Sequence, residues 1–395
     1  MEKLKTAVRY GADAVYFGGE VFSLRAGAGN LTVDEMKEAM EFLHAHGAKG
    51  YLTINIYPHN EDIQPLQEYI QQIREIPIDA FLVSDPGVMH LVKEGIPNAE
   101  IHLSTQANTT NYLSANFWVT HGVKRIVAAR EMSLKEIREM REHLPEDIEI
   151  EAFLHGAMCI SYSGRCLLSN YMVGRDANRG QCTHPCRWKY HLMEEKRPGE
   201  YFPIEEDDRG SYIMNSRDLC MLDCLPDMIN AGVTSLKIEG RMKSAYYVAT
   251  VVSAYRAALD SYLKDPENYE FKQEWYDELC KASHREFTHG FFYQKPSSKD
   301  QNYLTSDYVR EYSFIGVVLG VDEETGETIV QQRNKFCVGD EIEIMSPGEP
   351  FYTETVSSMK DEEGNAIESA PHPKQEVRIP FRRVPAKHSI LRKRK

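Results

Sequence analysis

The stretch VDEMKEAMEFLHAHGAKGYLTINI, residues 33–56, contains the unit that decides the fold. Residues 33–46 place apolar side chains at helical spacing, and Gly47 follows them as a helix end. Residues 50–56 form an apolar run that has the length of a buried strand. A helix that leads through a glycine into a buried strand is typical of a parallel βαβ unit.

The same alternation recurs along residues 1–264. We expect further helices over residues 1–10, 63–76, 87–94, 112–121, 134–143 and 244–263, and further strands over residues 13–17, 80–83, 101–103, 125–127, 148–154 and 235–238. The regular spacing of about 25 residues, with no sign of a reversal in strand order, favours an α/β fold of the TIM-like (β/α) barrel type over a doubly wound sheet.

The predicted barrel has seven strands, one fewer than a closed barrel needs. The chain begins at a helix, so either Tyr212 to Met214 supplies the eighth strand or the first strand is missing. We favour a barrel that lacks its first strand. The stretch from Trp188 to His191 and the one from Tyr212 to Met214 are expected to form a hairpin around the acidic insert 194–208.

Size and composition limit the class of protein. A chain of 395 residues with 42% hydrophobic content is expected to form two domains with large cores. We see no leader sequence and no apolar run of membrane-span length, so we expect a cytoplasmic protein with no membrane partner. In a reducing compartment, clustered cysteines are more often metal ligands or redox groups than disulfides.

Changes in sequence texture suggest the domain limits. The barrel is expected over residues 1–264, with a cysteine-rich insert at 155–224 and a connector at 265–312. Short alternating strands then predict a small all-β barrel domain over residues 313–380, of a kind that carries RNA contacts in some proteins and is a spacer in others. Residues 381–395 are expected to form a basic tail.

The charge balance argues against a generally basic surface. The net charge is -14, yet residues 374–395 contain nine Lys and Arg and one acid. This end of the chain is either a solvated, partly disordered segment or a contact to the phosphate backbone of RNA.

Six of the eight cysteines lie between Cys159 and Cys224. They are Cys159, Cys166, Cys182, Cys186, Cys220 and Cys224, and their spacings of seven and four differ from the short gaps of a zinc ribbon. An iron–sulfur cluster held by four cysteines from separate loops fits better. Free buried cysteine is the alternative, and we accept it for Cys280 and Cys337.

Polar residues follow most of the expected strands, where a (β/α) barrel gathers its chemistry. They include Asn55, Asp85, Ser104, Thr105, Gln106, Arg130, Glu131, His155, Glu239 and Arg241. His155 with Ser161 or Ser163 could instead be part of a hydrolase site. The chain has no G-x-S-x-G elbow, however, so we rank hydrolysis below redox chemistry.

The run Glu151 to Cys166 resembles the signature of the U-32 peptidase family, long labelled collagenase-like proteases. The resemblance covers most of the chain, including Ser104 to Gln106, Asn215 to Cys220 and Lys237 to Met242. Several members of that family are RNA or ubiquinone hydroxylation proteins that carry a 4Fe–4S cluster. The chain is most similar to the bacterial tRNA 5-hydroxyuridine hydroxylation proteins, which modify the wobble uridine and depend on prephenate. Family members usually begin with one more strand, which supports the missing-strand explanation.

The resemblance also implies roles for individual residues. The cluster ligands would be Cys159, Cys166, Cys182 and Cys220, with Cys186 as an alternative. We expect His155, Ser161, Ser163, Arg165, Glu239 and Arg241 to act at the catalytic site. Arg130 and Arg175, together with Arg165 and Arg241, are candidates to bind the carboxylates of prephenate as co-substrate. Tyr162, Tyr171 and Trp188 could stack on a uridine splayed out from the tRNA anticodon loop, although such aromatics are more often core.

Three alternatives stay open at this stage. The chain could be a U-32 family peptidase, as the family name implies. It could be a zinc-stabilised RNA-binding module without catalysis. It could also hydroxylate rRNA or a quinone ring. A paralogous family member is an expected protein partner.

Overall fold

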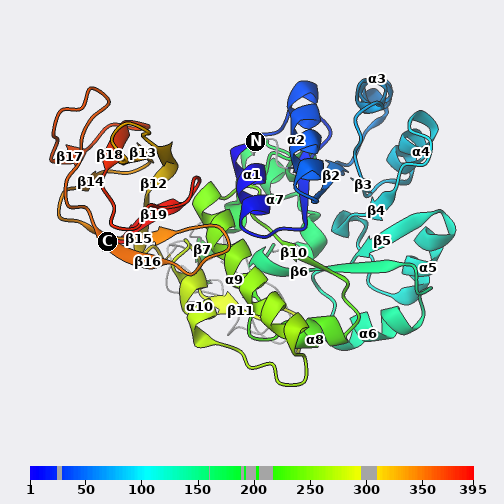
Figure 1. The fold of residues 1–395 in the computed structure, drawn as a ribbon. Coiled ribbons are helices and arrows are strands. Elements are labelled where there is room, and N and C mark those ends of the chain that lie inside the picture. The colour runs from blue at the N-terminus through cyan, green and yellow to red at the C-terminus, as the bar shows by residue number, and fades with distance from the viewer. Residues whose placement is uncertain (25–28, 160, 188–190, 193–201, 204–216, 295–308) are drawn as a thin grey trace.

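The computed structural model describes residues 1–24, 29–159, 161–187, 191–192, 202–203, 217–294 and 309–395. Within these residues, the first domain is built on seven parallel strands that neighbour one another in chain order (Figure 1). They are β1 (Ala14–Gly18), β2 (Lys49–Ile54), β3 (Ala80–Val83), β4 (Ile101–Leu103), β5 (Val123–Val127), β6 (Glu149–Ala157) and β10 (Ser235–Ile238). The order has no reversal, which confirms the (β/α) barrel winding expected from the sequence.

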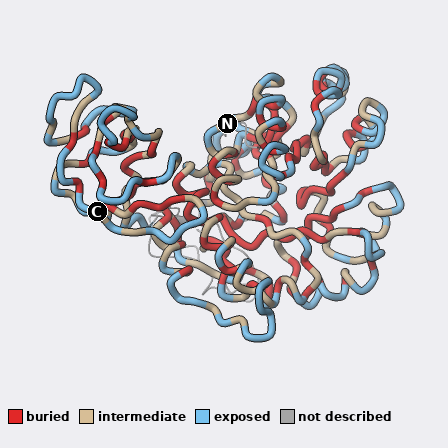
Figure 2. Tube along the Cα trace, in the orientation of Figure 1, coloured by how far each residue is buried: buried red, intermediate tan, exposed pale blue. Residues whose placement is uncertain are grey.

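Helices cover the outside of this sheet. They are α1 (Glu2–Arg9), α2 (Val33–Ala45), α3 (Ile63–Ile73), α4 (Pro86–Gly95), α5 (Tyr112–Thr120), α6 (Leu134–Glu142), α8 (Leu225–Asn230) and α9 (Ala245–Lys264). Capping boxes at Thr32 and Ser133 fix where α2 and α6 begin, and Asp85 caps α4. Figure 2 shows the buried residues along the strands, whereas the outer faces of the helices are exposed.

The barrel is open between β1 and β10. In the described part of the chain β1 pairs with β2 and β10 pairs with β6, and the two strands do not pair with each other. A cavity of about 920 Å³ lies there, lined by both strands and by α1. The first described element is α1, which begins at Glu2. Residues 212–214, the other candidate for the eighth strand, lie outside the described residues.

A buried group of charges crosses the barrel beside this opening. The Glu151 carboxylate on β6 accepts hydrogen bonds from Lys237 Nζ (2.5 Å) and Ser235 Oγ (2.7 Å) on β10, and from Arg125 Nη1 (3.1 Å) on β5. Glu151 is 4% exposed. Burial alone would raise the pKa of Glu151, but the charges of Lys237 and Arg125 outweigh it and lower the pKa to about 2. This group of charges therefore joins the neighbouring strands β5, β6 and β10.

The second domain is an antiparallel β domain, as predicted. Six strands form an open sheet in the order β16-β15-β19-β12-β13-β18 among the described residues, and β14 and β17 pair separately. Their bounds are β12 (Tyr312–Val321), β13 (Thr328–Gln332), β14 (Phe336–Cys337), β15 (Glu341–Met345), β16 (Tyr352–Thr355), β17 (Ser369–Ala370), β18 (Glu376–Ile379) and β19 (Ile390–Arg394). A compact apolar core around Phe336 holds this domain together.

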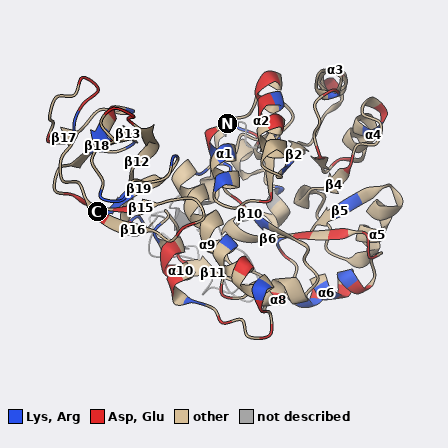
Figure 3. Cartoon of the chain, viewed as in Figure 1, with Lys and Arg blue, Asp and Glu red and all other residues tan. Residues whose placement is uncertain are grey.

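The predicted basic tail is instead part of this sheet. Strand β19 pairs with both β12 and β15, and Arg392 on β19 is fully buried. Its guanidinium pairs with Glu278 (2.5 Å) and Glu343 (2.7 Å), which neutralise the charge that made the segment look solvated. Both kinds of charge also occur along the exposed faces of helices such as α2 and α6 (Figure 3).

The segment 265–312, predicted to be a connector, contains elements that pack on the first domain. It contains α10 (Gln273–Cys280), which packs on α9 and supplies Glu278 to Arg392. It also contains β11 (Phe287–Thr288), which pairs in parallel with β9 (Asp218–Cys220) and extends the main sheet. Apolar side chains such as Trp275 and Leu279 are buried there, which a linker would not require.

A short hairpin is described within the region of the predicted one. Strand β7 (His191–Leu192) pairs with β8 (Phe202–Pro203), and the expected partners 188–190 and 212–214 lie outside the described residues. Among the helices that are described, none is long and apolar enough to cross a membrane.

The charge group on β6 gives a stability prediction. We expect Glu151→Gln to destabilise the protein by about 3–5 kcal/mol, because Lys237 and Arg125 would remain buried without their shared counter-ion. Urea unfolding followed by circular dichroism measures this loss. Glu149→Gln is the matched control, since Glu149 also pairs with Arg125 but is 47% exposed, and we expect its cost to stay below about 1 kcal/mol. Equal losses in the two variants would contradict the argument from burial.

The same group predicts a dependence on pH. The pKa of Glu151 is lowered on folding from 4.5 to about 2, so the stability from its ionised form is complete above pH 4.5 and is lost as the pH falls toward 2. The difference in unfolding free energy between the wild type and Glu151→Gln should therefore shrink across this range. A difference that stays constant down to pH 2 would contradict the lowered pKa.

Candidate active-site mouth and cysteine loops

The chain after β6 folds back over the ends of the barrel strands. It contains the short turn η3 (Tyr162–Gly164), helix α7 (Leu168–Val173), and the turns η4 (Ala177–Arg179) and η5 (Pro185–Arg187). Ser163 anchors the first turn, because its N–H (2.6 Å) and its Oγ (2.7 Å) both donate to the carboxylate of Glu131, in the loop after β5. Ser163 is 1% exposed and its hydroxyl is committed to a carboxylate, so it is placed as an anchor and not as a nucleophile.

Two arginines tie the same segment to other loops at the mouth. Arg165 donates through Nε to the Tyr57 hydroxyl, in the loop after β2, and to the Gln106 carbonyl (3.1 Å) in η2 (Thr105–Ala107). Arg179 forms a two-pronged pair with Asp62, at 2.7 Å for both bonds. These contacts join loops more than fifty residues apart and fix the cysteine segment against the barrel.

Cys166 is held by its backbone. Its N–H donates to Asn178 Oδ1 (3.2 Å), and its carbonyl accepts from Asn178 Nδ2 (3.2 Å). Ser169 Oγ also accepts from the Thr183 N–H (3.1 Å), which brings the segment that carries Cys182 beside α7. The loops that carry two of the predicted cluster ligands are therefore joined by side chain to backbone bonds.

The four predicted cluster cysteines share one local geometry. In each case the backbone N–H two residues further along the chain donates to the sulfur. The donors are Leu168 to Cys166 (3.3 Å), His184 to Cys182 (3.4 Å), Ser161 to Cys159, and Leu222 to Cys220. Such N–H donors stabilise negative charge on sulfur and tune the potential of iron–sulfur clusters. Ser161, which was predicted to be catalytic, therefore contributes its backbone N–H to the sulfur of Cys159.

Electrostatics place three of these sulfurs in one neighbourhood. Although Cys159 is an exposed residue, the protein atoms that surround its sulfur raise the pKa of the thiol, the nearby Cys166 and Cys182 raise it further, and Arg130 lowers it. Thiolates that lie close together repel one another. A bound cation would relieve this repulsion, because the thiolate is the form that binds a metal.

Cys220 lies on another element, and the cysteine whose charge affects its pKa is Cys280, not one of the other three predicted ligands. It lies on β9, opposite His155 on the end of β6, and its sulfur is 3.6 Å from the Tyr255 hydroxyl. Burial raises the pKa of Cys220 to about 12, so without a metal the thiol is neutral at pH 7.

His155, predicted to act at the catalytic site, is buried near the end of β6. Its ring is 2% exposed and is enclosed by Tyr247, Tyr255 and Phe287, on the side of β6 that faces α9. Burial, with Lys243 and His284 nearby, lowers the pKa of His155 to about 3. A neutral, enclosed imidazole supports packing around β6 and β9 and is not poised for acid–base work at neutral pH.

Arg241 and Glu239 lie at the mouth end of β10. Arg241 Nη1 donates to the Leu24 carbonyl (2.6 Å) and Nη2 to Asn30 Oδ1 (2.6 Å), so its guanidinium crosses the open side of the barrel toward β1. It passes over Gly18, where a Cβ would lie 1.7 Å from Nη2, so this position has no room for a side chain. Glu239 accepts from the Arg241 N–H (3.1 Å).

Arg130 and Arg241 both lie near Tyr16. The Arg130 guanidinium lies 3.7 Å from the centre of the Phe153 ring. Burial and Glu239 raise the pKa of Tyr16, and Arg241 and Arg130 lower it, so both cations lie within electrostatic range of this tyrosine. Arg175 is exposed on the cysteine segment.

The sequence did not reveal the residues that hold the mouth together. Tyr57, Asp62 and Asn178 belong to no motif, and the partner of Asp62, Arg179, is 117 positions away in the chain. Tyr162 and Tyr171 are exposed by 52% and 86%, which separates them from the core. Trp188 lies outside the described residues.

Comparisons with known proteins find similarity over nearly the whole chain. The family model described as peptidase family U32 matches residues 1–302, and the model of the U32 C-terminal domain matches residues 310–392. The chain is 43% identical to tRNA hydroxylation protein P1 of Bacillus subtilis over all of this chain and 93% of that protein. It is 36% identical to tRNA hydroxylation protein P of Escherichia coli, over 94% of this chain and 89% of that one.

Two further similarities cover parts of the chain. The 23S rRNA 5-hydroxycytidine C2501 synthase of Escherichia coli is 36% identical over 66% of this chain and 38% of its own length. A solved structure of the C-terminal domain of a U32 peptidase from Geobacillus thermoleovorans is 41% identical, with a TM-score of 0.20, and covers 20% of this chain and 99% of that domain.

The anchoring of the cysteine segment can be tested by proteolysis. We expect Asp62→Asn to increase trypsin cleavage within residues 161–187 by about tenfold, because a charge-assisted pair with Arg179 worth about 1.5 kcal/mol is lost. Mass spectrometry of the early fragments measures this rate. Asp34→Asn is the control, since Asp34 makes an exposed pair with Lys37 on α2. Equal cleavage rates in the two variants would show that the Asp62 pair does not hold the segment.

Proposed function

The chain belongs to peptidase family U32, and from this membership we propose that it is an RNA hydroxylase that acts on tRNA. Relatives named tRNA hydroxylation proteins match it over almost their whole length, and a further relative is named for hydroxylation of cytidine in 23S rRNA. The specific reaction we propose is formation of 5-hydroxyuridine at the wobble position. A tRNA substrate also implies that the protein acts in the cytoplasm.

The observation that carries this proposal is the shared geometry of four sulfurs. Cys159, Cys166, Cys182 and Cys220 each accept a backbone N–H from the second residue along the chain. We infer that these cysteines hold a 4Fe–4S cluster, with Cys186 next to Cys182 as the alternative ligand. When bound, such a cluster supplies a redox centre at the mouth of the barrel. A cubane is larger than a single ion, so its ligand sulfurs need not lie in mutual contact.

The residues of the chain have separate tasks in this proposal. Arg130 and Arg241, which both lie near Tyr16, are suited to hold the carboxylates of prephenate as co-substrate. Glu131, Tyr57 and Asp62 hold the cysteine segment in place through Ser163, Arg165 and Arg179.

An unpaired nucleobase of tRNA needs an exposed aromatic surface on which to stack. Tyr171 on α7 and Tyr162 in η3 are both exposed and both lie in the segment that carries Cys159 and Cys166. Aromatic rings of this kind bind unpaired bases, so we assign them to the splayed anticodon loop of tRNA. Unlike these two, Arg392 is buried and paired, so it is unsuited to an RNA phosphate.

The peptidase alternative is not favoured by the geometry. A serine peptidase needs a hydroxyl that donates to a base with an open approach for substrate. Ser163 donates to Glu131 and is buried, and His155 is enclosed by aromatic rings. The arrangement of these two residues favours a structural role.

The proposed reaction can be tested in cells. Deletion of the gene should remove 5-hydroxyuridine from tRNA, and Cys159→Ser or Cys166→Ser should fail to restore it, because each removes a proposed cluster ligand. Liquid chromatography and mass spectrometry of tRNA nucleosides measure the modification. Cys337→Ser, in the C-terminal domain, is the control and should restore it fully. Unchanged 5-hydroxyuridine in the deletion strain would overturn the proposal, provided that no paralogue is present.

A further inference from the structure

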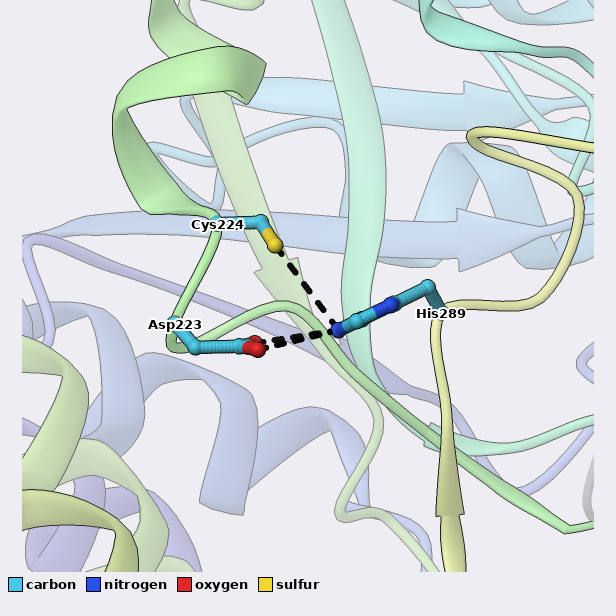
Figure 4. Close-up of side chains that lie close together, drawn as sticks. All are labelled: Asp223, Cys224 and His289. Atoms are coloured by element: carbon cyan, nitrogen blue, oxygen red, sulfur yellow. Dashed lines mark hydrogen bonds and ion pairs between the residues drawn. The ribbon is translucent and has the colours of Figure 1, made fainter. Parts of the chain in front are cut away.

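Three metal-binding side chains converge outside the four-cysteine set. Asp223 and Cys224 lie in the loop between β9 and α8, and His289 follows β11. One donor atom from each lies within 4.8 Å of the other two (Figure 4). Among the residues that the structure describes, this is the one such group of three histidine, cysteine or acidic side chains.

The geometry differs from that of a nucleophile and its base. His289 Nε2 lies 3.1 Å and 3.2 Å from the two Asp223 oxygens, and 3.7 Å from Cys224 Sγ. Both partners therefore approach the same ring nitrogen. A catalytic Cys–His–Asp relay requires the thiol on one nitrogen and the carboxylate on the other. Convergence of sulfur, oxygen and nitrogen on one point is instead the pattern of a coordination site.

From this convergence we propose that Asp223, Cys224 and His289 bind a single divalent transition ion of the zinc type. The inference goes beyond the proposed hydroxylation. Imidazole, thiolate and carboxylate are the three ligand classes that proteins use for zinc, and three protein ligands leave a fourth position for water. Calcium and magnesium prefer an all-oxygen set, which these residues do not provide.

The surroundings suit an accessible ion. A cavity of about 500 Å³ adjoins the group and is lined by Asp223 and His289, with Arg217, Tyr276 and Tyr293 around them. His289 and Asp223 are 44% and 39% exposed, so solvent reaches the fourth position. The Tyr293 ring packs edge-on against His289, at 5.5 Å between ring centres, and its hydroxyl bonds Asp227. Tyr293 thereby limits the rotation of the imidazole, as outer partners of metal ligands do.

The ion site is separate from the four-cysteine set. Cys220 also borders this cavity, yet its sulfur contacts the Tyr255 hydroxyl and accepts the Leu222 N–H. Cys224 contacts His289 instead. Two cysteines four residues apart therefore serve different centres.

Cobalt(II) is a suitable probe, because its bond to a thiolate gives a near-ultraviolet absorption band. The full-length chain with Cys159→Ser and Cys166→Ser, which lacks two proposed cluster ligands, should still bind cobalt with this band. Adding Cys224→Ser should remove the band, and adding His289→Asn should weaken cobalt binding by at least about 10- to 100-fold. Adding Cys337→Ser instead should leave both the absorption band and the affinity for cobalt unchanged. Circular dichroism verifies that each variant is folded.

A second measurement separates this site from the cluster. In the chain that keeps Cys159 and Cys166, purified without oxygen, Cys224→Ser should retain the acid-labile sulfide of the wild type. Loss of sulfide would assign Cys224 to the cluster and overturn the separate ion site. Absence of cobalt binding, or binding that Cys224→Ser and His289→Asn leave unchanged, would overturn it as well. If wild-type protein contains no sulfide while the cobalt results hold, the cluster proposal fails and the ion site stands.

Discussion

The buried carboxylate of Glu151 is the interaction on which the first domain depends. It is shared by Lys237 and Ser235 on β10 and Arg125 on β5, and it lies next to the side where β1 and β10 do not pair. Three charges that are buried together stabilise one another only while all of them are present. The side chains therefore add a second connection between β5, β6 and β10, which also pair through their backbones.

Strand β6 transmits this constraint to the cysteine loops. Glu151 fixes the strand near its start, and His155 packs against α9 at its other end, just before Cys159. Gly156, with φ of 124°, lies against Glu239, where a Cβ would be 2.7 Å away. The run from Glu151 to Cys166 therefore consists largely of residues that position a loop. The name peptidase describes the family, but in this chain Ser163 and His155 are buried and hold the loop and the strand in place.

The sequence predicted local structure well and distant contacts poorly. Apolar periodicity and glycine ends located the strands and helices of the barrel, since those signals are local. The burial of Arg392 could not be predicted from such local signals, because it depends on Glu278, 114 residues away. The burial of His155 could not be predicted for a related reason: whether a histidine near a strand end points to the mouth or to the outer helices depends on the register with β9, which the sequence does not state.

Sequence spacing also concealed the difference between Cys220 and Cys224. Four residues apart on one helix, two cysteines would share a face. Here the chain changes from strand to helix between them: Cys220 ends β9, and Cys224 caps the start of α8. The two sulfurs therefore diverge, one toward Tyr255 in the core and the other toward His289 at the surface. The proposed ion site has a mixed donor set and the proposed cluster has an all-sulfur set, and the change of element lies between Cys224 and Cys220, which we assign to the one and to the other.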